Sequence, residues 1–310
     1  MRLDDFDPND INVGDQRGQG GGGGFGFGGG GGGGGGGGLL FGLLPLIGSR
    51  FGCGGIVVVL LLLAVFGGLG NVGSLVSSGG GTAVTSRAPS AGGADAVRQA
   101  CTVDASSKAA CNAFESAQRT WETIFAAEGK RFAKPSLQFY AGNGQSGCGA
   151  AQSAMGPFYC PSDQGIYLDT SFFAELQNRF HVSGDFAQDY VIAHEFGHHI
   201  QNLLGTSDQV ARAGASATGA SGASVRLELQ ADCYAGVWAS KNRDRMDASD
   251  LQEGLTAAHA IGDDTLQEQS QGRVVPDSFT HGTSAQREHW LKRGYDTGDP
   301  AQCDTFSGAI

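Results

Sequence analysis

The sequence lacks an excess of basic residues, because 20 lysines and arginines stand against 31 aspartates and glutamates. The formal net charge of −11 offers no basic face to neutralise phosphates, which argues against a nucleic-acid partner. No two cysteines have the C-x-x-C spacing, so a zinc site built from cysteines is not expected. Only 16% of the residues are charged, whereas glycine occurs 54 times, which indicates segments of different kinds.

The first 38 residues have few apolar side chains, and we expect them to form a disordered tail. Residues 1–17 are polar and acidic, and residues 18–38 are nearly all glycine. The glycine tract has no strand or helix pattern beside it, as a phosphate-binding loop would need, so it should be a flexible coil.

An apolar region follows the tail. Residues 39–50 are too short to span a bilayer, but residues 51–70 carry no charge and match the thickness of its hydrocarbon core. We predict a single transmembrane helix at 51–70. A cleaved signal peptide is the alternative, and the fifty residues before it argue against cleavage. A Gly/Ser/Ala linker at 71–93 and one folded domain at 94–310 complete the expected organisation.

Six cysteines lie in the expected domain, at positions 101, 111, 148, 160, 233 and 303. An even set suits disulfides in an oxidising compartment. Proximity suggests the pairs Cys101–Cys111 and Cys148–Cys160, which leaves Cys233–Cys303. We therefore expect a single-pass cell-membrane protein whose C-terminal domain faces the periplasm or the cell exterior. Buried free thiols in a cytosolic domain are the alternative.

The motif with the clearest chemistry is H-E-x-x-H at residues 194–198. His194 and His198 are four residues apart, so on a helix both imidazoles leave one face and can bind one zinc ion. Glu195 can then reach a water on the metal as general base. A surface helix with two solvated histidines is the alternative, but the apolar flanks indicate a buried helix, where paired histidines need compensation.

A hydrolytic zinc site needs three protein ligands and an open position, so a third ligand is expected downstream. Glu228 and Asp232 are four residues apart on a second apolar helix and share a face. Glu228 is the best candidate for the third ligand, and Asp232 would orient a ligand histidine through its other ring nitrogen. A solvated acidic face is the alternative for this pair.

Three segments together resemble a known family: H-E-F-G-H-H, then L-E-L-Q-A-D-C-Y-A-G-V-W, then Ser278-Phe-Thr-His-Gly-Thr-Ser284. They are similar to the bacterial neutral zinc metallopeptidases (YpfJ-like), single-pass membrane proteins with an Asp-rich amino terminus. The resemblance covers essentially the whole chain and implies a zincin fold of gluzincin type. It implies His194, His198 and Glu228 as zinc ligands, one zinc per chain and Glu195 as the general base. The resemblance does not indicate a substrate.

His281 lies in a loop of the third segment, before the final helix. A metallopeptidase must stabilise the oxyanion of its tetrahedral intermediate, and a histidine delivered to the cleft can do so. The resemblance favours this catalytic role. The alternative is that His281 and Thr283 cap the final helix.

The expected fold class is α+β: a mostly helical zincin-like domain with a small sheet, preceded by the transmembrane helix. By analogy with zincins, residues 165–169 would be the edge strand that receives peptide substrate; an ordinary core hairpin is the alternative. Hydrophobic periodicity and turn signals predict a strand at 135–140, a hairpin of 157–160 with 166–169, and helices at 94–128, 172–180, from 185, 250–269 and 285–294.

These observations predict a membrane-anchored zinc peptidase that hydrolyses peptide or protein substrates through an activated water. The rival hypothesis is a non-catalytic zinc-binding scaffold tethered to the membrane. Retention of Glu195 favours the enzyme, because a purely structural zinc site has no use for a general base.

Overall fold

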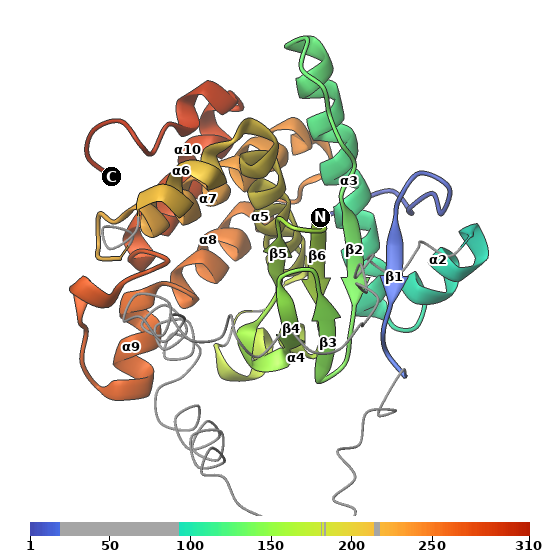
Figure 1. Ribbon diagram of the computed structural model, residues 1–310, viewed down its shortest axis with the longest axis horizontal. Helices are drawn as coiled ribbons and strands as arrows, with labels where there is room; N and C mark the ends of the chain where they lie inside the picture. Colours follow the sequence, from blue (N-terminus) through green and yellow to red (C-terminus); the bar gives the residue numbers. More distant parts are fainter. Residues whose placement is uncertain (19–92, 181, 183, 214–217) are drawn as a thin grey trace, which may run out of the picture. The chain divides into compact units, whose positions relative to one another are not determined.

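The computed structural model describes residues 1–18, 93–180, 182, 184–213 and 218–310 (Figure 1). Residues 1–18 and 87–310 belong to one compact unit. In the described residues this unit is a mostly helical α+β fold with a four-stranded sheet and a separate two-stranded hairpin. The predicted mixture of many helices with a small sheet is therefore correct for the folded unit.

The four-stranded sheet has the order β1-β2-β6-β5, built from Val13–Asp15, Ser136–Phe139, Gly165–Leu168 and Phe158–Cys160. β1, β2 and β6 are parallel, whereas β5 is antiparallel to β6. The edge strand on the β6 side is thus β5. The expectation that residues 165–169 form the edge is wrong, because the chain turns back after β5 and inserts β6 between β5 and β2.

The zinc-motif helix α5 (Asp185–Leu204) is mostly buried, and it packs against α3, α7 and α8 (Figure 1). The other helices are α2 (Ala94–Cys101), α3 (Ala105–Ala127), α4 (Ser171–Arg179), α6 (Thr206–Ala213), α7 (Ala223–Lys241), α8 (Asp250–Ala260), α9 (Asp263–Gln271) and α10 (Ser284–Thr297). Side chains from these helices and from the sheet form the main core, which includes Trp121, Phe196, Trp238 and Leu291.

Local chemistry explains several helix ends. Asp104 begins α3 by accepting a hydrogen bond from Ser107 N, and α5 ends at Gly205, whose φ of 76° is left-handed. Thr283 and Gln286 form a capping box at the start of α10. The helix expected over 250–269 is two helices, because the chain breaks at Ile261 and Gly262 between α8 and α9. The hairpin of β3 (Asn143–Ser146) and β4 (Gly149–Gln152) was not predicted.

The prediction of a transmembrane helix before the domain needs correction. Among the described residues, no helix is both long and apolar enough to cross a membrane. The segment 51–70 itself lies outside the described residues, as do the glycine tract and most of the linker.

The acidic N-terminal residues also differ from expectation, because they are folded against the domain. β1 pairs with β2, and Met1, Ile11 and Val13 belong to the hydrophobic core. The few apolar side chains of this segment cannot form a core of their own, but a surface supplied by the domain is sufficient for them to be buried.

All three proposed disulfides are present: Cys101–Cys111, Cys148–Cys160 and Cys233–Cys303. The first joins α2 to α3, and the third ties α7 to the C-terminal segment.

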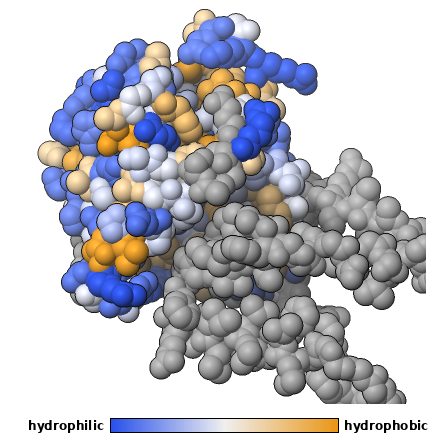
Figure 2. All heavy atoms as spheres, turned by 60° about the vertical axis from the view of Figure 1, so that its left-hand side comes forward, coloured by the Kyte–Doolittle hydropathy of each residue, from blue (hydrophilic) through white to orange (hydrophobic). Residues whose placement is uncertain are grey.

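On the face drawn in Figure 2, the coloured surface is mostly polar, and hydrophobic side chains occur in small separate groups. Disulfides, a main hydrophobic core and a smaller cluster that includes Tyr140 and Tyr167 hold the described unit together.

Candidate active site

The two helices that carry the expected metal ligands touch almost backbone to backbone. α5 and α7 approach at Gly197, where an added Cβ would lie 3.0 Å from the Cα and from the carbonyl oxygen of Ala231. A side chain at residue 197 would push the helices apart. Glycine therefore lets the short Glu228 side chain on α7 reach both histidines on α5.

Three side chains from α5 and α7 meet at one point. Glu228 Oε2 lies 3.2 Å from His194 Nε2, and Glu228 Oε1 lies 3.6 Å from His198 Nε2. The two imidazole rings are perpendicular, with centroids 4.9 Å apart. One ligand atom from each residue lies within 4.8 Å of the others, which is close enough for one ion to bind all three.

Hydrogen bonds to the other ring nitrogens aim both histidines at this point. His194 Nδ1 is 2.7 Å from Asp232 Oδ1, and His198 Nδ1 is 2.8 Å from Gln201 Oε1. With both Nδ1–H groups donating, two Nε2 lone pairs and a carboxylate face one another, an arrangement that needs a cation between them. Two imidazoles and one carboxylate are the donor set of a catalytic zinc with a position left open, so the residues fit zinc.

The local charges also favour a cation. Burial acts to lower the pKa of His194, but Asp232 and Glu228 outweigh it and raise the pKa to about 10. Burial would raise the pKa of Glu228, yet His198 and His194 hold it well below its usual range. A carboxylate that stays ionised beside two buried imidazoles will attract a divalent ion as well as a proton.

Glu195 is buried on α5 between the two histidines in sequence, and only 7% of it is exposed. Burial raises its pKa, although the nearby imidazoles of His198 and His194 oppose this effect. A carboxyl group whose pKa moves toward neutrality is better able to accept a proton and then return it. Its position and its environment both suit a general base beside a metal.

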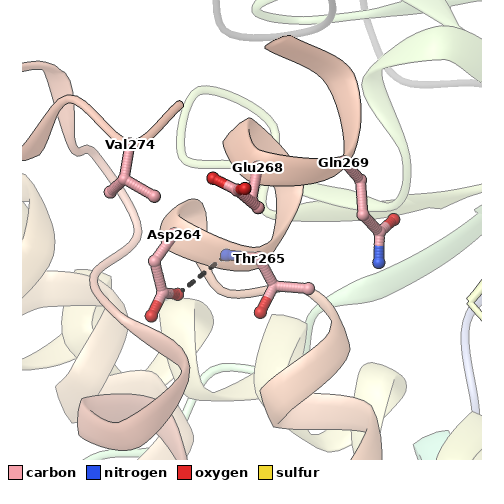
Figure 3. Close-up of a pocket in the computed structure, with 5 residues that line it drawn as sticks. All are labelled: Asp264, Thr265, Glu268, Gln269 and Val274. Carbon is pink, nitrogen blue, oxygen red and sulfur yellow. Dashed lines mark hydrogen bonds between the residues drawn. The ribbon is translucent and has the colours of Figure 1, made fainter. Parts of the chain in front are cut away.

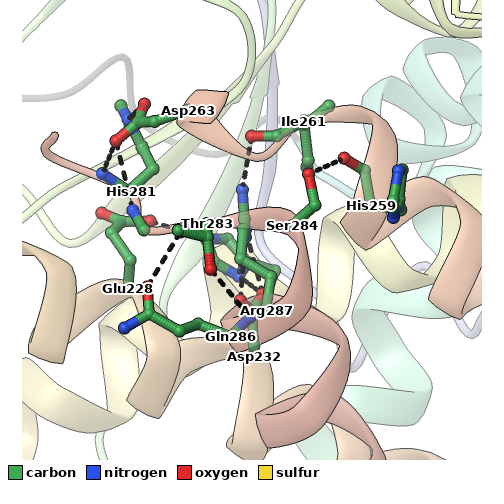
Figure 4. Close-up of polar contacts among 12 residues, drawn as sticks. Glu228, Asp232, His259, Ile261, Asp263, His281, Thr283, Ser284, Gln286 and Arg287 are labelled. Carbon is green, nitrogen blue, oxygen red and sulfur yellow. Dashed lines mark hydrogen bonds and ion pairs between the residues drawn. The ribbon is translucent and has the colours of Figure 1, made fainter. Parts of the chain in front are cut away.

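Asp232 is fully buried and anchors the network behind His194 (Figure 4). Arg287 Nε donates to Asp232 Oδ2 at 2.8 Å, and Arg287 Nη2 donates to Oδ1 at 2.9 Å. The Tyr190 hydroxyl donates to Oδ1 at 2.6 Å. Burial raises the pKa of Asp232, but Arg287 and His194 overcome it and hold the pKa at about 2. Asp232 therefore stays ionised and fixes the Nδ1–H tautomer of His194.

Three residues of this network were not predicted from the sequence: Tyr190, Gln201 and Arg287. Gln201 donates from Nε2 to Leu227 O at 2.6 Å, which turns its Oε1 toward His198. Tyr190 and Gln201 could have been found, because they lie four residues before His194 and three after His198 on the same helix face. Arg287 gives no such signal, since it comes from α10, far along the chain.

His281 is placed beside Glu228 by the loop before α10 (Figure 4). Asp263 Oδ2 accepts hydrogen bonds from the backbone N–H groups of Thr280, His281 and Gly282, and Asp263 Oδ1 lies 3.2 Å from His281 Nδ1. The imidazole is about half exposed. Thr283 caps α10, whereas the His281 side chain bonds to Asp263, so the capping alternative holds for Thr283 only.

His199 connects α5 to the edge strand. Its Nε2 donates to Ala133 O at 2.7 Å, and its Nδ1 accepts from the Tyr159 hydroxyl on β5 at 3.1 Å. Asn202 Nδ2 donates to the same hydroxyl at 2.9 Å. Burial lowers the pKa of His199 to about 4, so it stays neutral. β5 is thereby held against the helix that carries the candidate ligands.

A cavity of about 450 Å³ lies at α9 and is lined by Asp264, Thr265, Glu268, Gln269 and Val274 (Figure 3). None of these residues belongs to the ligand cluster. Asp264 accepts hydrogen bonds from Thr265 N at 3.0 Å and from Ser284 N at 2.7 Å, so it supports the start of α10. The cavity is distinct from the metal-ligand cluster.

Two helical histidines, a glutamate from a neighbouring helix and a buried carboxyl group beside them are typical of zinc metallopeptidases. Comparison with known families agrees with this class. The chain belongs to the family described as "Putative neutral zinc metallopeptidase", whose model matches residues 5–306. At the level of the family, the chain is therefore a zinc peptidase.

Relatives occur in distant bacteria. The YpfJ protein of Escherichia coli K12 is 55% identical over 195 residues, which is 62% of this chain and 68% of the relative. The Mb2605 protein of Mycobacterium bovis is 48% identical over 191 residues, 57% of this chain and 64% of the relative. No solved structure matches the chain.

Proposed function

We propose that this chain hydrolyses peptide bonds at one zinc ion per chain, held by His194, His198 and Glu228. The observation that carries the proposal is the convergence of these three side chains within 4.8 Å, with Glu195 buried beside them. A bound zinc ion would act as a Lewis acid toward the scissile carbonyl and make water more acidic. A closed structural site would use a fourth protein ligand, and the described residues place only three in this cluster.

Each residue has a defined part in this scheme. Glu195 takes the proton from the attacking water and gives it to the leaving amine, which its raised pKa favours. His281 donates a hydrogen bond to the developing oxyanion, while Asp263 holds its ring through Nδ1. Asp232 and Gln201 keep the ligand histidines oriented throughout.

The geometry of the sheet supports a route for substrate binding. Within the described residues β5 is an edge strand, so its outward backbone groups can pair with an extended peptide. The hydrogen bonds from Tyr159 to His199 and from Asn202 to Tyr159 hold this strand next to α5. A peptide added along β5 therefore runs beside the helix of His198. We propose β5 as the substrate strand, in place of residues 165–169.

The three disulfides support an oxidising compartment as the place of action. Bonds of this kind persist in secreted and periplasmic proteins and are rare where thiols are kept reduced. The domain that carries the site would accordingly meet proteins or peptides outside the cytosol.

The test replaces Glu195 with Gln in the full chain and compares zinc content with hydrolysis of fluorophore-labelled casein. Glu195→Gln keeps the shape of the side chain but removes the base, so zinc content should stay near one per chain. Hydrolysis should fall by at least about 100-fold, the contribution typical of a positioned acid–base group.

The matched control is Glu228→Ala, which removes a proposed ligand and should lower both zinc content and hydrolysis. Full activity in the Glu195→Gln protein would overturn the mechanism. Zinc content unchanged in Glu228→Ala would show that Glu228 is not a ligand, whatever the activity.

A further inference from the structure

We infer that residues 1–18 act as a self-contained peptide ligand of the domain formed by residues 93–310, and stay bound without a covalent connection. The inference does not depend on the proposed peptidase activity. It rests on the contacts that these 18 residues make with β2, α2, α3 and α8, elements that all follow residue 92 in the chain.

The segment adds a strand to the sheet. Val13, Gly14 and Asp15 pair with Leu137, Gln138 and Phe139 in parallel register. Leu137 N donates to Asn12 O at 2.9 Å, and Gln16 N donates to Phe139 O at 2.8 Å. Without β1, β2 would be an open edge with unpaired backbone groups, a state that sheets tend to avoid. The domain therefore offers a preformed site for one extended peptide.

Three apolar side chains anchor the segment at its two ends. Met1 is 6% exposed, Ile11 is 5% exposed and Val13 is 2% exposed, and all three belong to the main hydrophobic core. Burial of each such side chain removes apolar surface from water and so stabilises the bound segment. Their wide separation along the segment makes binding depend on its whole length.

Polar contacts fix the part of the segment between the anchors. Asn112 and Glu115 on α3 accept hydrogen bonds from Phe6 N at 3.1 Å and Asp7 N at 3.0 Å. Gln118 Nε2 donates to Asp10 O at 3.1 Å. Polar side chains of α3 thus hold the backbone of the segment in place along this helix.

Charges select an acidic segment. Lys108 lies 2.8 Å from Asp5, and Lys134 lies 2.5 Å from Asp10. After β1, Arg17 reaches back to the domain, where its guanidinium donates to Ala100 O at 2.6 Å and to Ser107 Oγ at 2.7 Å. The basic side chains of the domain thus lie opposite the aspartates of the segment. Because these ion pairs are exposed, they contribute only weakly to binding, and the buried apolar side chains and the strand pairing contribute more.

The docked segment also reaches the helix of the candidate site. The Met1 ammonium group lies 2.9 Å from Asp185, the first residue of α5, and 3.2 Å from Asp250 on α8. Release of the segment would remove this contact and expose the core around β2. We therefore expect the domain to be less stable after release of the segment.

The test uses the full chain with a recognition site for a sequence-specific protease placed within residues 19–38 and cut after folding. The cut protein should elute from size exclusion as one species containing both pieces in equal amounts. Val13→Asp places a charge at a buried position of β1, so after cutting this variant should lose the N-terminal piece and unfold several degrees lower.

Asn12→Asp is the matched control, because it adds the same charge at the neighbouring exposed position and should retain the piece. Separation of the two pieces in the protein with native residues 1–18 would overturn the inference. A cut protein that elutes as a dimer through exchanged N-terminal segments would also overturn it, since the segment would then serve a second copy.

Discussion

Asp232 decides the geometry of the candidate metal site although it is not expected to touch the metal. Its two oxygens accept hydrogen bonds from His194, Tyr190 and Arg287 inside a fully buried pocket. Arg287 is itself only 3% exposed, so each partner neutralises the charge of the other. The ionised carboxylate makes His194 donate from Nδ1 and leaves Nε2 for a metal.

Asp232→Asn should weaken zinc binding about 10- to 100-fold, because the amide is a poorer acceptor for His194 Nδ1–H. Zinc affinity is measured by competition with a coloured chelator, after circular dichroism has verified the fold. Tyr190→Phe is the control: it removes one hydrogen bond to Asp232 but leaves the charge, so its effect should be smaller. Equal affinities in the native and Asp232→Asn proteins would contradict this role.

Close helix contacts allow side chains from three helices to converge. Gly197 brings α5 to α7, and Gly236 and Gly294 bring α7 to α10. A Cβ on Gly236 would lie 2.1 Å from Leu291 O, and one on Gly294 would lie 1.9 Å from Cys233 O. Since α10 carries Arg287 and α7 carries Asp232, this contact sets the length of their ion pair.

Gly294→Ala should lower the free energy of unfolding by about 1–3 kcal/mol or more, because the clashing atoms are backbone atoms that cannot rotate away. The measurement is unfolding in urea, followed by tryptophan fluorescence. Gly93→Ala is the control, since a Cβ there meets nothing within 4 Å and should change stability by no more than about 0.5 kcal/mol. Equal stability of the two variants would show that the helices can separate freely.

At the scale of the whole molecule, disulfides close loops of very different length. Cys233 and Cys303 are separated by 70 residues, and this bond holds the C-terminal segment against α7. Gln230 Nε2 adds a hydrogen bond of 3.0 Å to Cys303 O. Cys101 and Cys111 are only 10 residues apart. A longer closed loop removes more entropy from the unfolded chain.

The double variant C233A/C303A should therefore lose about 4 kcal/mol of stability, and C101A/C111A about 3 kcal/mol, by the loop-entropy estimate. Chemical denaturation under non-reducing conditions provides both values. C101A/C111A is the control, because it also removes a buried disulfide but opens a much shorter loop. A larger loss in C101A/C111A would mean that local packing, and not loop length, determines the contribution.

The sequence determined the local features whose signals lie within a few residues. Helical spacing placed His194 with His198 and Glu228 with Asp232, and proximity gave the two short disulfides, with the third left by elimination. Periodicity and turn residues located β2, the β5–β6 hairpin and most helices, because these depend on interactions between near neighbours in the chain. Residues 51–70 were assigned to a transmembrane helix from their length without charge and from the family resemblance, and no helix in the described part of the chain is long and apolar enough to cross a membrane.

Only the tertiary structure decided which elements meet. It set β5, not β6, at the sheet edge, brought Arg287 from α10 to Asp232, and bound residues 1–18 to a domain that begins more than seventy residues later. The physical reason is common to all three. Burial and pairing depend on surfaces that distant segments supply, and no local pattern records which surface will be available.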